Sequence, residues 1–321
     1  MGSLGGAGGR FVVAGEGWRA RKMHYVGQAT PVKSLVRGNR RMPQPTMLEK
    51  ILVPSDLSDE SNSVIPYAVT LAQAFHSKLY LLHVMDPASL KGPENLLDFP
   101  RLTRMLALDV NAPDLPPLKK SVTVAKMYLY KKDRAGAIAE SAASKKVDLI
   151  CMASNKDGVN LAWWSVGSII ESIIAGTPCH VLCIRGRPIK DRDWKRPRFK
   201  HVLSLTELGS AGAETFLKIL PLVHKFDSML HVFPLVTGRT GHSPEHNPLR
   251  EVARIHPART NILLFANPDQ RLRNLLDFVK KTPIDLIVMA PSTRSKFSNR
   301  LVNDVLVKLL GATDSPVLLL R

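Results

Sequence analysis

The sequence predicts an α/β protein with two doubly wound domains, each built on a five-stranded parallel sheet. Short apolar runs alternate with amphipathic stretches of helical length, which is typical of βαβ units. The runs are apolar throughout rather than in alternation, as expected for strands that are buried on both faces of a sheet. The whole pattern occurs twice, in the same order, within the 321 residues.

The first copy opens with an apolar run at residues 50–56, which is predicted as a buried strand that ends at a turn. Asp56 and Ser58 supply helix-capping side chains, and apolar residues follow at 3.6-residue spacing as far as Phe75. The other predicted elements of this copy are strands at 79–84, 122–128, 148–153 and 181–185, and helices at 90–108 and 134–145.

The second copy opens with a strand at 201–207 and a helical stretch that reaches Phe226. Its offset from the first copy is 151 residues at the first strand, 148 at the second, 137 at the fourth and 136 at the last. Each decrease falls in a predicted loop, where deletions are tolerated. The other predicted elements are strands at 228–232, 261–265, 285–290 and 317–321, and a helix at 270–281.

The composition excludes several classes of protein. Hydrophobic residues make up 45% and charged residues 22%, which argues against collagen, coiled coil and wholesale disorder. No apolar run reaches the roughly 18 residues that a membrane helix needs, so no membrane partner is expected. Three cysteines without a CxxC pair indicate neither a disulfide framework nor a zinc site, and we expect a cytoplasmic protein.

The net charge of +18 is concentrated in two segments. Residues 1–46 carry eight cations against Glu16 alone, and residues 185–200 carry eight against two aspartates. Such segments attract polyanions without sequence preference, but we favour a solvated tail and linker over a nucleic-acid site. We therefore divide the chain into a disordered basic tail (1–46), a first domain (47–187), a basic linker (188–198) and a diverged second domain (199–321). The tail lacks the apolar core of a signal peptide, and whether it belongs to the mature protein is left open.

Several motifs of the first copy resemble those of the universal stress protein (UspA-like) family. They are the run Ile51–Ser58, the strand end His83-Val84, Asp148–Met152, the pair Gly167-Ser168, and Pro178–Leu182. The resemblance covers residues 47–187 as a complete copy and 199–321 as a diverged one. It implies the strand order 3-2-1-4-5 in each domain and a tandem stress-response protein that is not an enzyme, apart from slow ATP hydrolysis at most.

In one branch of that family, ATP or AMP binds between strands one and four, which agrees with the general rule for open α/β sheets. The resemblance implies that Asp56 accepts a hydrogen bond from the adenine amino group and that the backbone near Val84 flanks the base. Met152 and Ala153 would lie beneath the ribose, and the helix that begins at Gly167 and Ser168 would hold the phosphates. The expected cofactor-binding residues are Ser55, Asp56, Val84, Met152, Ala153, Gly158, Gly167 and Ser168.

The sequence departs from the nucleotide-binding pattern, in which two further glycines precede Gly167. Those positions hold Ser154 and Asp157, and Gly158 stands one place too late, so it could serve only if the loop shifts. In the second copy Glu207 stands where Asp56 does in the first, and the loop at 290–299 has no glycine. We therefore expect a weakened site in the first copy and none in the second.

An alternative function is a nucleotide-free interaction module of the same fold. In either case, the resemblance implies that the two copies form a pseudo-dimer within the chain by pairing their last strands, 180–184 with 316–320. Further pairing into a homodimer is left open.

Other chemistry is not supported by the sequence. The HxxEH pattern at 242–246 contains Pro244, which favours a loop over the helix that a zinc hydrolase needs. His83 and His231 occupy matching strand ends at the offset of 148, which suggests packing or hydrogen bonding rather than metal binding. We find neither a Walker A sequence nor a GxSxG elbow, and we expect no catalytic residue and no metal.

Overall fold

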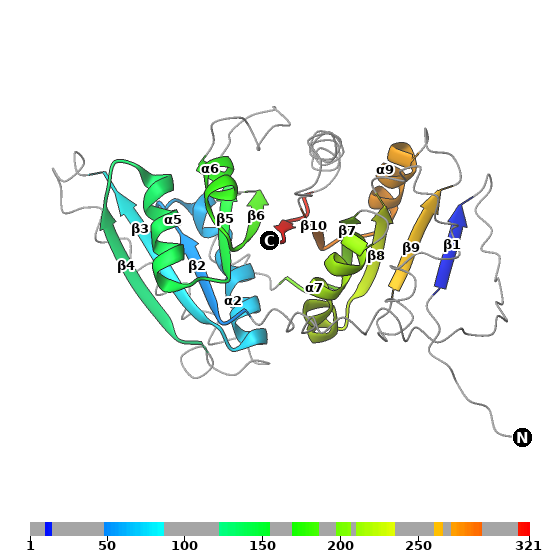
Figure 1. The fold of residues 1–321 in the computed structure, drawn as a ribbon, viewed down its shortest axis with the longest axis horizontal. Helices are drawn as coiled ribbons and strands as arrows, with labels where there is room; N and C mark the ends of the chain where they lie inside the picture. Colours follow the sequence, from blue (N-terminus) through cyan, green and yellow to red (C-terminus); the bar gives the residue numbers. More distant parts are fainter. Residues whose placement is uncertain are drawn as a thin grey trace, which may run out of the picture.

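The computed structural model describes residues 10–14, 48–86, 122–154, 169–185, 197–206, 210–234, 260–265, 271–290 and 314–321. Within these residues eleven strands form one sheet, in the order β1-β9-β8-β7-β10-β11-β6-β5-β2-β3-β4 (Figure 1). All neighbouring strands of this sheet run parallel except β6 and β11, which are antiparallel. The predicted α/β class with a mostly parallel sheet is thereby confirmed.

The strands are β1 (Arg10–Ala14), β2 (Lys50–Pro54), β3 (Lys78–Met85), β4 (Val124–Tyr130), β5 (Leu149–Ser154), β6 (His180–Arg185), β7 (His201–Thr206), β8 (Met229–Pro234), β9 (Thr260–Phe265), β10 (Leu286–Met289) and β11 (Val317–Leu319). The helices are α1 (Asp59–Asn62), α2 (Ile65–Phe75), α5 (Arg134–Lys145), α6 (Ile169–Gly176), α7 (Ser210–Phe226) and α9 (Arg271–Lys281). We call β2 to β6 with their helices the first half, and β7 to β11 with theirs the second half. The helix predicted at 90–108 lies outside the described residues.

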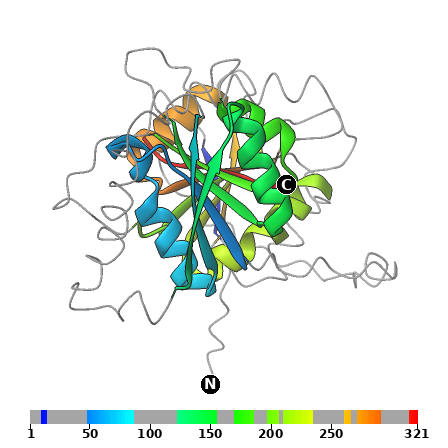
Figure 2. The same ribbon diagram turned by 90° about the vertical axis from the view of Figure 1, so that its left-hand side faces the viewer.

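Helices cover both faces of the sheet. The apolar sides of α2 and α7 pack into one core on the first face, and those of α5, α6 and α9 pack into a second core on the opposite face. Figure 2, seen from the end of the sheet, shows α2 and α5 on opposite sides of the strands. This two-sided burial explains why the strands are continuous apolar runs.

The two halves meet in a packed junction. Leu182 of β6 lies opposite Leu318 of β11 in the antiparallel register. On the face of α2 and α7, the rings of Phe75 and Phe226 have centroids 6.4 Å apart, and the fully buried Phe199 lies 4.9 Å from Phe226. Both cores contain residues from the two halves, so the junction is continuous with the interior of each half.

The same main-chain hydrogen bonds recur in both halves at an offset of 151 residues. Ser77 and Ser228 each donate an N–H to a helix carbonyl five residues earlier, at 2.9 Å in both cases. Lys78 and Met229, which begin β3 and β8, each donate an N–H to the carbonyl of the residue directly before the preceding strand, Glu49 and Lys200, at 2.7 Å in both cases. The first strand, helix and second strand of the two halves therefore superpose in sequence without an insertion.

An aspartate directly precedes the fourth strand of each half, Asp148 before β5 and Asp285 before β10, and its role explains the repeated Asp-Leu-Ile motif. Asp148 accepts a hydrogen bond through Oδ2 from the backbone N–H of Lys50 at 2.9 Å. Asp285 accepts one in the same way from His201 at 2.8 Å. Each carboxylate thus fastens the start of one strand to its neighbour, which is why the sequence carries an acidic residue directly before an apolar run.

The expected equivalence of His83 and His231 is wrong. The register of β3 on β2 and of β8 on β7 places Tyr80 and His231 at the same position of their halves, and His83 matches Pro234. The offset at the second strand is therefore 151 rather than 148. The shared letters Leu-His-Val suggested the false match, whereas the pairing is fixed by main-chain hydrogen bonds that do not depend on those side chains.

The structure also differs from the expectation that residues 1–46 contain no regular element. Arg10–Ala14 forms strand β1, which pairs in parallel with β9 at the end of the sheet, with Arg10 opposite Asn261. The segment is a short run rich in β-branched and aromatic residues, and β9 is the outermost strand of the second half. An open sheet edge accepts such a segment because its main-chain groups lack partners.

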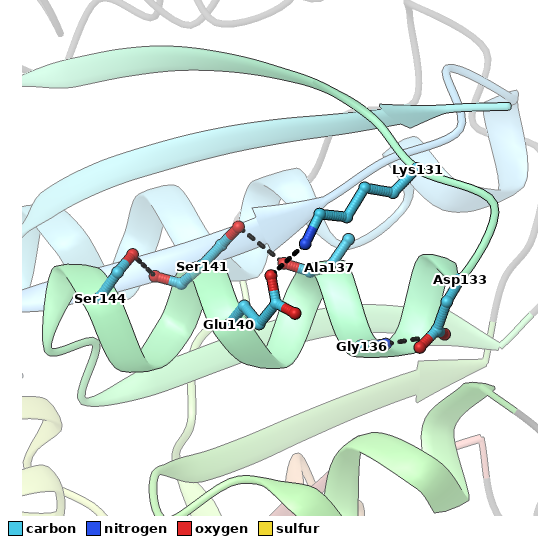
Figure 3. Close-up of polar contacts among 7 residues, drawn as sticks. All are labelled: Lys131, Asp133, Gly136, Ala137, Glu140, Ser141 and Ser144. Atoms are coloured by element: carbon cyan, nitrogen blue, oxygen red, sulfur yellow. Dashed lines mark hydrogen bonds and ion pairs between the residues drawn. The ribbon is translucent and has the colours of Figure 1, made fainter. Parts of the chain in front are cut away.

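Helix α5 begins with a side-chain cap that gives a first testable prediction (Figure 3). The Asp133 carboxylate accepts a hydrogen bond from the Gly136 N–H at 2.9 Å, and a Cβ at Gly136 would overlap that carboxylate. We expect Asp133→Ala to lower the free energy of unfolding by about 1 kcal/mol, since a helix N-terminal donor loses its acceptor. Urea denaturation measures the change, with Ser144→Ala at an exposed position of the same helix as control; equal stability of the two variants would contradict it.

Candidate functional site

The candidate site lies at the carboxyl ends of β2 and β5. The strand order reverses direction at β2, which has β3 on one side and β5 on the other. The register of β2 with β3 continues to Pro54 and Leu82, whereas that with β5 ends at Leu52 and Ile150, so β2 and β5 separate toward their carboxyl ends. In open α/β sheets, ligands bind where strands separate in this way.

Ser55, the first residue after β2, is fixed at three of its atoms. Its N–H donates to the carbonyl of Leu82 at 2.9 Å, and its Oγ accepts from the N–H of Leu57 at 2.9 Å. Its carbonyl oxygen lies 2.8 Å from Nδ1 of the buried His83. Because a carbonyl can only accept, Nδ1 of His83 carries the hydrogen. The residue that precedes Asp56 is therefore held to both the second strand and the following turn.

A buried polar network lies behind the turn. The Ser55 hydroxyl is 2.9 Å from the Ser61 hydroxyl and donates to Oδ1 of Asn62 at 3.1 Å. Asn62 is only 2% exposed, and its Nδ2 donates to the carbonyl of Leu57 at 3.4 Å. Leu57 has a φ of 71°, a left-handed conformation that is uncommon for a bulky residue and needs support from its surroundings. The network supplies that support.

The exposed Asp56 occupies the outer side of the same turn. Its Oδ1 accepts hydrogen bonds from the N–H and the hydroxyl of Ser58, at 3.0 and 2.6 Å. Partial desolvation would raise the pKa of Asp56, but hydrogen bonds from Ser58 and Ser61 outweigh it and leave the pKa below its ordinary value. The side chain is therefore an oriented, ionised hydrogen-bond acceptor at neutral pH.

The other expected site residues in the described chain contribute differently. Val84 and Met152 are buried with the α5 side of the sheet, so their side chains belong to the core. Ala153 is partly buried and packs, like Leu57, against the core on the α2 side. Met152 and Ala153 were expected to end the strand, but β5 continues to Ser154, which pairs with Arg185. Gly158, Gly167 and Ser168 lie outside the described residues, as do Glu207 and the HxxEH segment.

Sequence reasoning missed Asn62 and assigned His83 only a general packing or hydrogen-bonding role. The signal for Asn62 was the polar triplet Ser61-Asn62-Ser63, which is buried next to an apolar helix. In the second half the positions of Asn62 and His83 hold Ala213 and Pro234, whose side chains form no hydrogen bonds. The polar network therefore exists in the first half alone among the described residues.

Three further findings concern cavities, metal sites and membrane-spanning helices. A cavity of about 30 Å³ lies between α2 and α7 at the junction, which is room for about two water molecules and far too little for a nucleotide. Among the residues that the structure describes, no three His, Cys, Asp or Glu side chains gather closely enough to hold a metal ion. Within that part of the chain, none of the helices is both long and apolar enough to cross a bilayer.

The sequence matches the profile of the universal stress protein family over residues 47–185. It is 26% identical to universal stress protein MJ0531 of Methanocaldococcus jannaschii over 150 residues, which is 45% of this chain and 86% of that protein. The fold resembles a universal stress protein from Archaeoglobus fulgidus, with a TM-score of 0.58 and 14% identity over 86% of this chain and 97% of that one. It also resembles the functionally unknown protein PA1789 from Pseudomonas aeruginosa, with a TM-score of 0.58 and 16% identity over 86% and 93% of the two chains.

Proposed function

We propose that the first half, whose residues 47–185 match the universal stress protein family, binds an adenine nucleotide, ATP or AMP, at the carboxyl ends of β2 and β5. The second half does not bind one in this proposal. The protein then acts in the stress response by binding and not by catalysis.

The observation that carries this proposal is the presentation of Asp56. Asp56 is exposed next to the carboxyl end of β2, and hydrogen bonds from Ser58 hold its carboxylate in a fixed orientation. The adenine amino group is a donor, and the lowered pKa of Asp56 keeps the carboxylate charged when that donor approaches. The residues present thus fit the base of an adenine nucleotide, and Gly158, Gly167 and Ser168 remain the proposed phosphate-binding residues.

We further propose that the halves are duplicated domains related by an approximate two-fold axis at the junction. Each half has its strands in the order third, second, first, fourth, fifth. The paired residues Leu182 and Leu318 are equivalent positions of the fifth strands, and the packed rings of Phe75 and Phe226 are equivalent positions of α2 and α7. Contacts between equivalent residues are what a two-fold interface requires.

The test is calorimetric titration of the whole protein with ATP and AMP. We expect Asp56→Ala to weaken binding by roughly 10- to 150-fold, which corresponds to the 1.5–3 kcal/mol of a charged hydrogen bond. Ser141→Ala is a matched control, because it removes a buried hydroxyl that bonds within α5, away from the site. Equal affinities of the wild type and Asp56→Ala would exclude the role of Asp56.

One observation favours a second function, that of a nucleotide-free interaction module. Ser154 stands where a nucleotide-binding member carries glycine, and here it is an ordinary strand residue in register with Arg185. A Cβ at this position impedes the close backbone approach that phosphates require. Absence of heat with either nucleotide, for the wild type as well as the variants, would support this function.

A further inference from the structure

We infer that Ser55, Asn62 and His83 are positioning residues that hold the Asp56 turn in the geometry that receives the ligand. This inference rests on the proposed nucleotide function. None of the three needs to contact the nucleotide: the Ser55 and Asn62 side chains bond inward to each other and to Leu57, and His83 bonds to the Ser55 carbonyl. They act on the ligand only through the carboxylate of Asp56.

These bonds fix the backbone of the turn at Leu57. Leu57 keeps its left-handed conformation while its N–H and carbonyl are bonded to Ser55 and Asn62. If the Ser55 hydroxyl is removed, the buried Asn62 Oδ1 and the partly buried Leu57 N–H each lose this partner. A buried polar group without a partner is costly, so the turn relaxes toward solvent and carries Asp56 with it.

The second half provides a natural comparison. Alanine and proline stand at the positions of Asn62 and His83, so the side chains that hold the turn are missing there. Thr206, at the position of Ser55, is buried in the same fold, which indicates that a β-branched residue fits this environment. Ser55→Thr is therefore a conservative variant that keeps the hydroxyl.

The experiment compares affinities for ATP and inosine triphosphate, whose base carries an oxo group in place of the amino group. A well-placed Asp56 carboxylate prefers ATP, because it accepts from the amino group and repels the oxo oxygen. We expect Ser55→Ala and Asn62→Ala to reduce this preference by about five- to tenfold, with Ser55→Thr restoring it. Ser141→Ala, which removes a buried hydroxyl in α5, keeps the wild-type ATP preference. If the variants acted only by lowering stability, Ser141→Ala and Ser55→Ala would reduce the ATP preference alike.

A double-mutant cycle separates this inference from the proposed function. If Ser55 acts through Asp56, adding Ser55→Ala to Asp56→Ala causes no further loss of ATP preference. The proposed function is overturned if the wild type binds ATP and inosine triphosphate equally well. It is also overturned if Asp56→Ala has the same ATP preference as the wild type. An Asp56→Ala variant that loses the preference while Ser55→Ala and Asn62→Ala keep it overturns the inference alone. Asn62→Ala supplies the cycle if Ser55→Ala does not fold.

Discussion

Replacement of Phe199 by alanine is expected to lower the free energy of unfolding by about 3–5 kcal/mol, the range for truncation of a large buried aromatic residue. Phe199 is fully buried two residues before β7, the first strand of the second half. Its ring packs edge-on against Tyr67 of α2 at 6.1 Å and Phe226 of α7 at 4.9 Å. The variant therefore removes a ring that contacts residues of both halves. It leaves a cavity that can close only if one half moves relative to the other.

Urea denaturation of the full chain measures this loss. The matched control is Tyr130→Ala, which removes a ring of similar size from the outermost strand β4, where the side chain is 48% exposed. We expect a change of less than about 1 kcal/mol there. If Phe199→Ala cost no more than Tyr130→Ala, the junction between the halves would not be a cooperative core.

The second large effect is a loss of stability in acid that originates at His231. Burial and then the neighbouring His201 lower the pKa of His231 from 6.5 to about 4. The side chain is 5% exposed, its Nε2 lies 3.2 Å from Nδ1 of His201, and the ring packs edge-on against Phe278. Its Nδ1 has no hydrogen-bond partner in the described part of the chain. A proton on this ring is therefore strongly disfavoured in the folded state.

The direction in which stability changes with pH follows from which state, folded or unfolded, binds the proton. Between pH 6.5 and pH 4 the unfolded chain protonates His231 and the folded protein does not, so stability falls as the pH is lowered through this interval and this contribution is constant below it. A pKa difference of about 2.5 corresponds to about 3 kcal/mol. Chemical denaturation at a series of pH values should show this slope, reduced in His231→Gln. His224→Gln, at an exposed position of α7, is the matched control.

Direct titration of His231 by NMR provides an independent check. An imidazole that titrates near pH 6.5 in the folded protein would exclude the effect. So would a stability slope that is unchanged in His231→Gln.

The elements that the sequence predicts most accurately are those fixed by local pattern. The helix at 134–145 is predicted to its end residues, and α2, α7 and α9 end at the expected residues because the apolar spacing stops there. Strand alignments at offsets of 151, 137 and 136 agree with the observed registers, since each rests on a complete apolar run. Buried strands leave strong signals of this kind.

Features that depend on tertiary partners were not predicted. The pairing of β1 requires the edge of β9, from which it is about 250 residues away, and no local pattern contains that information. The match of His231 to Tyr80 is visible only in the main-chain register. Asn62 was overlooked because its role depends on the strained turn at Leu57, and such turns cannot be recognised from residue type alone when no glycine marks them.

The antiparallel pair at the junction has a consequence for synthesis on the ribosome. β6 ends at Arg185 and its partner β11 begins at Val317, so about 130 residues must be added before the pair can close, which takes roughly 7–26 s at typical translation speeds. Throughout that time the nascent first half presents an uncovered apolar edge at β6. Two chains emerging on one polysome can join through these edges, and a chaperone that shields β6 would suppress such misassembly.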